Sequence, residues 1–398
     1  METDIVIVGA GPVGLCLARS LSGSGLRIVV VEQQSLDEIE NPKFDGREIA
    51  LTQRSARIMQ QMGLWDRIES DERSPLSAAK VFNGSSPSAL EIGHELGGHN
   101  ELGWLVSNCV IRKAAYDALR GGMTENGNVT LLTSETVTGI KTDSVSANVT
   151  TGHGLTISAS LIVAADNRFS TTRKMMGIAA EMRDFGKSML VCRMTHDEPH
   201  HHTAWEWFGY DQTLALLPLN PDPSTNAHRS SVVLTLPGRE IAELARLDPE
   251  EFRLNIEQRF ARRLGSMELV STRHVYPLVS VYPGRFVGQR FATVGDAAVG
   301  MHPVTAHGFN FGLVGVETLS KEILDARLNG LDIAADSVLA RYESRHRRAT
   351  KPLYLATRFI TDVFTNSTAP ARLARDIMLR AASHFMPFRK AVAASLTG

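Results

Sequence analysis

The chain has 398 residues, of which 43% are hydrophobic, so it can bury a substantial core, and its length is typical of about two domains. Its 42 Lys and Arg residues balance 43 Asp and Glu residues, which argues against nucleic acid as the main ligand. The three cysteines, Cys16, Cys109 and Cys192, are widely spaced and form no CxxC pair, which argues against a disulfide framework and against a cysteine zinc site.

The N-terminal residues lead directly into an apolar strand, without a basic leader or a cleavage site. No apolar run reaches the roughly 18 residues that a membrane-spanning helix needs. We therefore expect a cytoplasmic protein, with peripheral attachment to the inner face of the membrane left open.

The first stretch, "DIVIVGAGPVGLCLARSLSGSGLRIVVVEQQ" at residues 4–34, has the pattern of a strand, a helix and a second strand. The apolar run over 5–8 is typical of a strand buried on both faces of a parallel sheet. A GxGxxG motif follows at the start of the helix. The motif consists of Gly9, Gly11 and Gly14, with Pro12 and Val13 in its helical part.

Glu32 ends the second strand of this unit and stands 18 residues after Gly14. A carboxylate about 20 residues beyond the motif is where dinucleotide-binding units hydrogen-bond a ribose. The stretch therefore predicts a dinucleotide site, although the motif alone does not separate NAD from FAD. The alternative is a structural βαβ unit with a glycine-rich turn.

Two later stretches carry further candidate ligands. In "FDGREIALTQRSARIMQQMGLWDRI", residues 44–68, Arg47 lies in a predicted loop ahead of a helix that ends at Gly63. Its guanidinium suits a pyrophosphate, and the alternative is a solvated arginine. In "LIVAADNRFSTTRKMMG", residues 161–177, a buried strand ends at Asp166. Ligands bind at the carboxyl ends of strands in open α/β sheets.

The stretch "GDAAVGMHPVTAHGFNFGL", residues 295–313, places Asp296 among small residues and Gly308 at the start of a predicted helix. Small residues allow close approach by a backbone or a ligand. A helix start accommodates negative charge. We therefore expect a ligand near Asp296.

Together these stretches resemble the single-component FAD-dependent aromatic hydroxylases, and more narrowly the ubiquinone-biosynthesis hydroxylases. Three other stretches are similar to the substrate-domain strands, the approach to the flavin and the C-terminal helices of that subfamily. They are "HHHTAWEWFGYDQTLALLPL" (200–219), "YPLVSVYPGRFVGQRFATVGDAA" (276–298) and "RYESRHRRATKPLYLATRFITDVF" (341–364). The likeness covers nearly the whole chain in the order of the family.

The resemblance implies an α/β fold like that of para-hydroxybenzoate hydroxylase, with a discontinuous Rossmann-like FAD-binding domain, an antiparallel-sheet substrate domain and C-terminal helices. The FAD-binding domain is expected over 1–75, 101–180 and 286–345. The substrate domain is expected over 76–100 and 181–285. Residues 346–398 would form the C-terminal helical region.

The resemblance also assigns roles to individual residues. Asp296 would hold the ribityl chain of FAD, and the helix after it would stabilise negative charge on the reduced flavin. Asn108 would offer an amide to the cofactor, with Arg112 as a weaker candidate, and the alternative for both is an ordinary helix-surface residue. The expected cofactor-binding residues are Gly9, Gly11, Pro12, Val13, Gly14, Glu32, Arg47, Asn108, Arg112, Asp166, Asp296, Gly308 and Asn310. Pro303 and His307 are the expected catalytic residues.

The sequence departs from the family pattern at several positions. Val299 replaces a usual histidine, Ala306 replaces a usual glycine, and Asn167 replaces a usual glycine after Asp166. His307 takes the place of a usual glutamine, so it is either a proton relay to a phenolic substrate or a structural replacement that bonds backbone. The run "HDEPHHH" at 196–202 is interpreted as a solvated strand connection, with a metal site as the alternative, and no metal is expected.

The implied reaction begins with reduction of non-covalently bound FAD by transient NAD(P)H. Molecular oxygen then gives a flavin hydroperoxide, which hydroxylates an electron-rich ring. A prenylated phenol or quinol intermediate of ubiquinone biosynthesis is the expected lipophilic substrate, with demethoxyubiquinol hydroxylation as one possible step. The alternatives are hydroxylation of a polar aromatic or polyketide substrate, reduction of prenyl double bonds, and a non-catalytic FAD-binding scaffold.

Residues 341–398 combine basic and apolar side chains at helical spacing. Such a surface suits anionic lipid, where a bilayer-dissolved substrate would be collected. The alternative is that these helices only pack on the FAD-binding domain.

Overall fold

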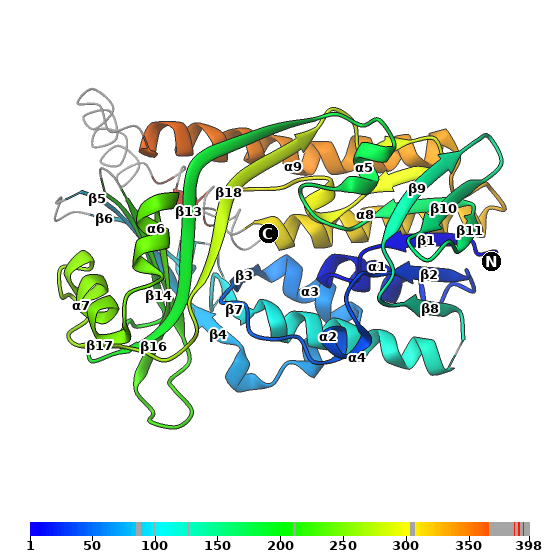
Figure 1. Ribbon diagram of the computed structural model, residues 1–398. Coiled ribbons are helices and arrows are strands. Elements are labelled where there is room, and N and C mark those ends of the chain that lie inside the picture. Colours follow the sequence, from blue (N-terminus) through cyan, green and yellow to red (C-terminus); the bar gives the residue numbers. More distant parts are fainter. Residues whose placement is uncertain are drawn as a thin grey trace.

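The computed structural model describes residues 1–84, 89–96, 98, 100–125, 127–209, 212–302, 307–365, 386, 389–390 and 393. Two lobes lie along the long axis of the molecule, and a pair of long strands connects them (Figure 1). One lobe is built on a mostly parallel sheet covered by helices, and the other on a larger curved sheet.

The first lobe contains a six-stranded sheet in the order β19-β20-β12-β1-β2-β8. Its strands are β1 (Ile5–Val8), β2 (Ile28–Val31), β8 (Val129–Leu132), β12 (Leu161–Ala164), β19 (Val287–Gly288) and β20 (Phe291–Thr293). All neighbouring pairs are parallel except β19 with β20. The strands β1 and β2 are buried on both faces of this sheet, as their apolar sequences predict.

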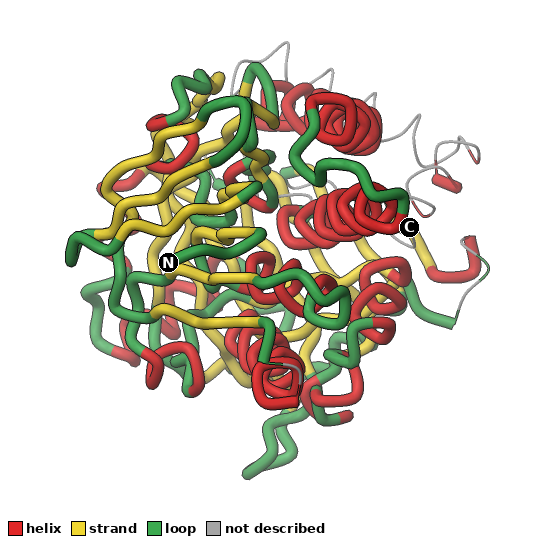
Figure 2. Tube along the Cα trace, turned by 90° about the vertical axis from the view of Figure 1, so that its right-hand side faces the viewer, coloured by secondary structure: helices red, strands yellow, loops and turns green. Residues whose placement is uncertain are grey.

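Alternate residues of this sheet enter two different cores. Ile5 and Ile7 pack with helices α1 (Pro12–Leu21), α4 (Asn108–Glu125) and α8 (Gly308–Leu328). Val6 and Val8 pack instead against β9 (Val137–Thr142), β10 (Ala147–Thr151) and β11 (Thr156–Ala159), which form a small antiparallel sheet. Figure 2, seen from the end that carries the N-terminus, shows the helices gathered beside the strands.

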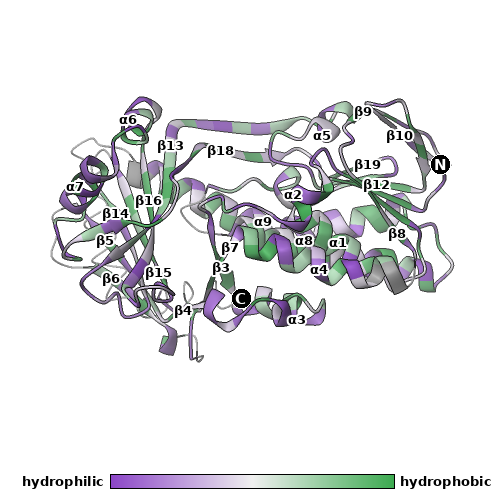
Figure 3. Cartoon of the chain, turned by 60° about the horizontal axis from the view of Figure 1, so that its bottom comes forward, coloured by the Kyte–Doolittle hydropathy of each residue, from purple (hydrophilic) through white to green (hydrophobic). Residues whose placement is uncertain are grey.

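The second lobe is an eight-stranded sheet in the order β17-β13-β16-β15-β14-β5-β6, with β18 also paired to β13. The strands are β5 (Ala78–Asn83), β6 (Ala89–Gly93), β13 (Ala180–His196), β14 (Thr203–Phe208), β15 (Thr213–Leu219), β16 (His228–Pro237), β17 (Met267–Leu269) and β18 (His274–Pro283). Helices α6 (Gly238–Leu244) and α7 (Pro249–Arg259) cover one face. The strands β13 and β18 extend from this lobe to the first (Figure 3).

One pair in the larger sheet differs from the expectation of an antiparallel sheet, because β5 and β14 run parallel. The two strands come from separate segments of the chain, so no hairpin fixes their relative direction.

We propose that the two lobes are the FAD-binding and substrate domains with the boundaries expected from the sequence.

A third, smaller sheet lies between the lobes in the order β3-β7-β4, formed by β3 (Glu48–Thr52), β4 (Ser74–Leu76) and β7 (Gly103–Ser107). The sequence predicted only a loop and a helix around Arg47, whereas β3 separates Arg47 from α3 (Gln53–Gln61). The remaining elements are α2 (Leu36–Glu40), α5 (Thr171–Met175) and α9 (Asp336–Thr365), with one-turn helices at Trp65–Arg67, Ser70–Glu72, His94–Leu96 and Gly295–Ala297.

The long helices α8 and α9 pack against each other. Buried Glu322 on α8 pairs with Arg341 and Arg345 on α9, at 2.7 and 2.5 Å. None of the helices in the described part of the chain has the length and apolar character needed to cross a membrane.

Candidate functional site

A cavity of about 610 Å³ lies where the two lobes meet. Its wall from the first lobe includes Gly11, Pro12, Val13, Glu32, Gln34, Arg47, Asn108, Arg112, Asp166, Arg168, Asp296, His302 and Gly308. Its wall from the larger sheet includes Phe185, Lys187, Met189, Val191, Glu206, Phe208, Thr213, Ala215, Leu217, Val233 and Thr235. The cavity therefore joins a polar half, at the carboxyl ends of parallel strands, to a largely apolar half.

The three motif glycines have different tasks. A Cβ on Gly9, whose φ is +108°, would lie 2.6 Å from the carbonyl oxygen of Ala165, and one on Gly14 would lie 1.9 Å from that of Gly9. These two glycines allow the strand and the helix to approach each other. A Cβ on Gly11 would meet nothing within 4 Å, so this position leaves open space on the cavity wall.

Glu32 follows β2 at the edge of the cavity. Its carboxylate accepts hydrogen bonds from the backbone N–H of Ala10 at 2.6 Å and of Gln34 at 2.9 Å. Arg112 donates to the side-chain oxygen of Gln34 at 2.6 Å. Glu32 and Arg112, which were selected separately in the sequence, therefore border the same corner of the cavity.

Arg47 and Asn108 are held by a residue that sequence reasoning missed, Asp45. The Arg47 guanidinium pairs with the Asp45 carboxylate at 2.5 Å, and the Asn108 amide donates to the same oxygen at 2.8 Å. Burial alone would raise the pKa of Asp45, but Arg47 and Asn108 outweigh it and hold the pKa below its ordinary value. The Arg47 guanidinium also lies 5.3 Å from the centre of the Tyr276 ring.

Asp296 is fixed by Arg168. The Arg168 Nε and Nη2 atoms donate to one Asp296 oxygen at 3.1 and 2.7 Å, and its Nη1 donates to the carbonyl oxygen of Val279 at 2.8 Å. Arg168 thus connects Asp296 to β18. In the sequence, the only indication was its position two residues after Asp166.

Asp166 has one satisfied and one unsatisfied oxygen. Its Oδ2 atom accepts from the Thr172 hydroxyl at 3.0 Å. Its Oδ1 atom is buried and has no hydrogen-bond partner in the described part of the chain. Buried carboxylate oxygens are rarely left unpaired, so this atom is suited to accept from hydroxyl or N–H groups of a ligand.

Two helices begin at the cavity. Gly11 precedes the first turn of α1, His307 precedes that of α8, and neither caps its helix with a side chain. Gly308 and Pro12, the first residues of these helices, line the cavity. The first N–H groups of both helices therefore favour negative charge there.

The structure places the expected site residues in three groups. Those that line the cavity are Gly11, Pro12, Val13, Glu32, Arg47, Asn108, Arg112, Asp166, Asp296 and Gly308. Gly9, Gly14, His307 and Asn310 are not among the lining residues. Pro303 falls outside the described residues.

Asn310 and His307 both support the start of α8. The Asn310 amide accepts from the backbone N–H of Thr52 at 3.2 Å and donates to the carbonyl of Ala50 at 2.8 Å, which ties α8 to β3. His307 is buried, with its ring 5.8 Å from that of Phe311. The choice between a structural role and a proton relay for His307 stays a prediction.

His302 lies at the junction of the two halves. Its ring makes an edge contact with the Phe185 ring, with centroids 4.7 Å apart. Burial, together with the positive charges of Arg168 and Lys187, lowers the pKa of His302 to about 4. This imidazole is therefore neutral at physiological pH.

The histidine run at 196–202 connects β13 to β14 and is mostly exposed, as expected, but His196 and His200 are buried. The His196 ring bonds the Ser230 hydroxyl at 2.8 Å, and the His200 ring bonds the Leu219 carbonyl at 3.0 Å. Within the described ranges, no group of three or more His, Cys, Asp or Glu side chains is placed to hold a metal ion.

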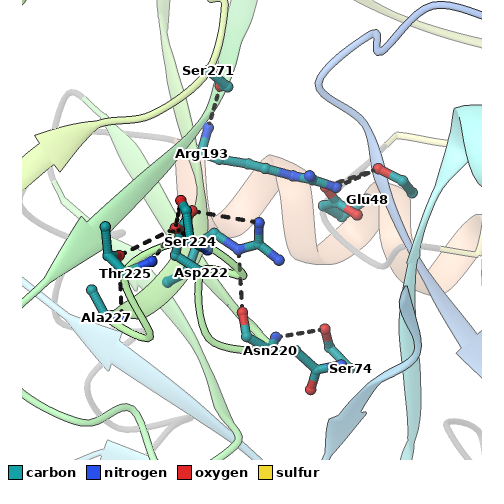
Figure 4. Close-up of polar contacts among 11 residues, drawn as sticks. Glu48, Ser74, Arg193, Asn220, Asp222, Ser224, Thr225, Ala227 and Ser271 are labelled. Atoms are coloured by element: carbon teal, nitrogen blue, oxygen red, sulfur yellow. Dashed lines mark hydrogen bonds and ion pairs between the residues drawn. The ribbon is translucent and has the colours of Figure 1, made fainter. Parts of the chain in front are cut away.

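An ion pair between Arg193 and Glu48 joins the larger sheet to the small sheet that lies between the lobes (Figure 4). Arg193 on β13 donates to Glu48 on β3 at 2.8 Å and to the Ser107 hydroxyl at 2.7 Å. The Glu48 side chain is only 1% exposed. Nothing in the sequence linked these residues, because they lie 145 positions apart.

Comparison with known proteins gives a consistent result. The family described as "FAD binding domain" matches residues 2–355. The chain is 44% identical to ubiquinone hydroxylase UbiM of Neisseria meningitidis, over 100% of this chain and 85% of the relative, and 32% identical to ubiquinone hydroxylase UbiL of Rhodospirillum rubrum, over 97% and 87%. Its fold resembles the crystal structure of p-nitrophenol 4-monooxygenase PnpA from Pseudomonas putida, with a TM-score of 0.78 at 19% identity, covering 100% of this chain and 99% of that one.

Proposed function

Because the chain belongs to the FAD binding domain family, and within it to the FAD-dependent aromatic hydroxylases, we propose that it hydroxylates a prenylated phenol or quinol intermediate of ubiquinone biosynthesis. Demethoxyubiquinol hydroxylation is the proposed step. The names of the two relatives, both ubiquinone hydroxylases, support this substrate class.

The observation that carries the proposal is the continuity of one cavity across both lobes. On the polar side, the residues fit FAD. Gly11 leaves space where a pyrophosphate passes, the two helix starts favour its negative charge, and the unpaired Asp166 oxygen can accept from a ligand hydroxyl. We propose that Glu32 binds the ribose and that Asp296 binds the ribityl chain.

On the other side, the face of the larger sheet offers a mostly apolar wall for an aromatic ring and a prenyl chain. Bound FAD supplies the redox chemistry, with NAD(P)H as electron donor and molecular oxygen as oxidant. The chain orients the ring against the flavin and keeps water out, while the start of α8 favours negative charge on the flavin.

The proposed substrate is tested by deleting the gene and analysing the extracted quinones by mass spectrometry. We expect an intermediate that lacks one ring oxygen to accumulate, and the mature quinone to return when the wild-type gene is supplied. A variant with Asp296→Ala should restore less of it. An unchanged quinone pool would refute the proposed pathway.

We also propose that α9 contacts the membrane surface, where such a substrate dissolves. Lys351, Leu355 and Phe359 recur at four-residue spacing on one side of α9, and Leu355 and Phe359 are 49% and 57% exposed. An exposed basic and apolar stripe suits anionic lipid. Several other basic residues of α9 are already paired within the protein, Arg358 with Glu181 among them.

Flotation with anionic vesicles at low salt tests this contact. The wild type should float, and the double variant Leu355→Ser with Phe359→Ser should remain at the bottom. The matched control, Leu328→Ser with Leu331→Ser, removes two exposed leucines near the end of α8 and should still float. Equal behaviour of the two double variants would exclude this face of α9. Deletion of 366–398, which falls mostly outside the described residues, tests the rest of the expected surface.

A further inference from the structure

Glu206 is the feature of the cavity that the proposed function leaves unexplained. It lies on β14, a strand labelled in Figure 3, and it lines the larger-sheet wall of the cavity. The strand register places it beside Ala215 of β15 on one side and Val81 of β5 on the other. Continuing across the sheet, Ala215 pairs with Val233, and Val233 with Val191. Glu206 is thus the one carboxyl in a row of apolar side chains.

The Glu206 side chain has no hydrogen bond or ion pair with any residue in the described ranges. It is only partly accessible, and it contributes to the cavity wall. A carboxyl in such surroundings gains from a partner that a ligand brings, because an unpaired polar group in an apolar wall is unfavourable.

No charged group on the neighbouring strands β5 and β15 pairs with the Glu206 carboxyl. The strand β15 contains no charged residue, and Lys80 of β5 pairs across from Trp205, on the opposite face of the sheet, where it binds Glu91 at 3.4 Å. Lys187 of β13 and His302 are the other charged or titratable groups of the cavity wall near the larger sheet. Burial alone raises the pKa of Glu206 to about 8, so the carboxyl is mostly neutral at pH 7.

We propose that Glu206 pairs with the free ring hydroxyl of the substrate and so selects a phenol or quinol over its ether. The proposal rests on the proposed function for the identity of the ring. The hydroxyl donates its proton in a hydrogen bond to a Glu206 oxygen, which directs that edge of the ring to the sheet. When the carboxyl is ionised, it is a stronger hydrogen-bond acceptor and polarises the O–H bond of the phenol. The ring then becomes more electron-rich, which favours its attack on an electrophilic oxygen.

The test compares two probes of nearly equal size on the FAD-loaded protein, without NAD(P)H or oxygen. The probes are 4-methoxyphenol and its methyl ether, 1,4-dimethoxybenzene, and binding is measured by calorimetry between pH 6 and pH 9. The wild type should bind the phenol about fivefold tighter than the ether, the value of roughly one hydrogen bond. This preference should increase as the pH rises through about 8, since the ionised carboxyl accepts more strongly.

Three variants complete the design. Glu206→Leu should bind both probes alike at every pH. Glu206→Gln should keep part of the preference, because its amide oxygen accepts a hydrogen bond, but lose the pH dependence. Glu240→Gln, an exposed change on α6, is the matched control and should behave as the wild type. Circular dichroism and flavin content establish that each variant is folded and loaded.

Retention of the wild-type preference by Glu206→Leu would overturn the proposal. So would equal binding of the two probes to the wild type, or binding of neither. The outcome is separable from that of the proposed function, because no turnover is needed. If the protein prefers the phenol but forms no oxygenated product, the proposed hydroxylase activity is refuted and the proposed role of Glu206 stands. If it hydroxylates the ring but shows no preference for the phenol, the role of Glu206 is refuted and the activity stands.

Discussion

At the residue scale, two motif glycines are expected to differ in role: Gly14 is needed for the stability of the fold, and Gly11 for binding of the ligand. Gly14→Ala would force a Cβ against the Gly9 carbonyl at 1.9 Å, and we expect it to destabilise the protein by about 1 to 3 kcal/mol. Gly11→Ala meets open space, so it should leave the stability of the apoprotein unchanged while weakening FAD binding. Urea denaturation and flavin fluorescence titration measure the two effects. Loss of apoprotein stability in Gly11→Ala would contradict this division.

Asp296 gives a second prediction at this scale. Asp296→Ala removes a charged acceptor proposed for the ribityl chain, at a cost of about 1.5 to 3 kcal/mol, or roughly a tenfold to hundredfold weaker Kd for FAD. Asp296→Asn keeps an acceptor and should lie between this variant and the wild type. A control, Asp325→Ala, removes an exposed ion pair on α8 and should bind FAD normally. Unchanged FAD affinity in Asp296→Ala would refute its role.

The sequence identified those residues whose chemistry is tied to local pattern. Gly11 and Glu32 stand at fixed distances from a predicted strand and helix, so their positions followed from spacing. Asp45 and Glu206 were missed, because their importance comes from neighbours distant along the chain: Asn108 for Asp45, and the apolar row of the sheet for Glu206.

At the element scale, long apolar or periodic stretches were predictable, and short strands were not. The strand over 5–8 and the helix that follows appear at the expected positions as β1 and α1. The strand β3 was missed, because its pairing with β7 is a contact between distant segments. The parallel pairing of β5 with β14 was missed for the same reason, because it joins distant segments and no local pattern specifies it.

The ion pair between β3 and β13 is a prediction about elements. Arg193→Met leaves the buried Glu48 with the Ser107 hydroxyl but without its charged partner, so we expect a loss of about 3 to 5 kcal/mol in the free energy of unfolding. The double variant Glu48→Gln with Arg193→Met removes the uncompensated charge and should recover part of that loss. Urea denaturation followed by tryptophan fluorescence measures both. If the single variant were as stable as the wild type, the pair would not stabilise the contact between the small sheet and the larger sheet.

At the scale of the whole molecule, stability should fall in mild acid. His346 lies on α9 and is buried against Gly315 of α8. Both its ring nitrogens lack partners in the described part of the chain, and burial lowers its pKa to about 4. The unfolded chain binds a proton at this position below about pH 6.5, so stability is fully present above that pH and is lost as the pH falls toward 4. The loss is on the order of 3 kcal/mol for this histidine.

Urea denaturation at pH 7.5, 6 and 5 provides the measurement, with His346→Leu as the comparison. The variant should lose less stability between pH 7.5 and pH 5 than the wild type. Parallel curves for the two proteins would show that His346 does not cause the acid sensitivity.

The central claim for the whole molecule is that one cavity brings a flavin and an aromatic ring together for oxygen transfer. In the most direct measurement, the FAD-loaded protein is incubated with NAD(P)H, a short-chain prenylphenol and oxygen-18 gas. The product is then analysed by mass spectrometry. We expect a ring-hydroxylated product that carries one oxygen atom from the gas. Consumption of NAD(P)H with a product that contains no oxygen-18, such as one with a reduced prenyl double bond, would contradict it.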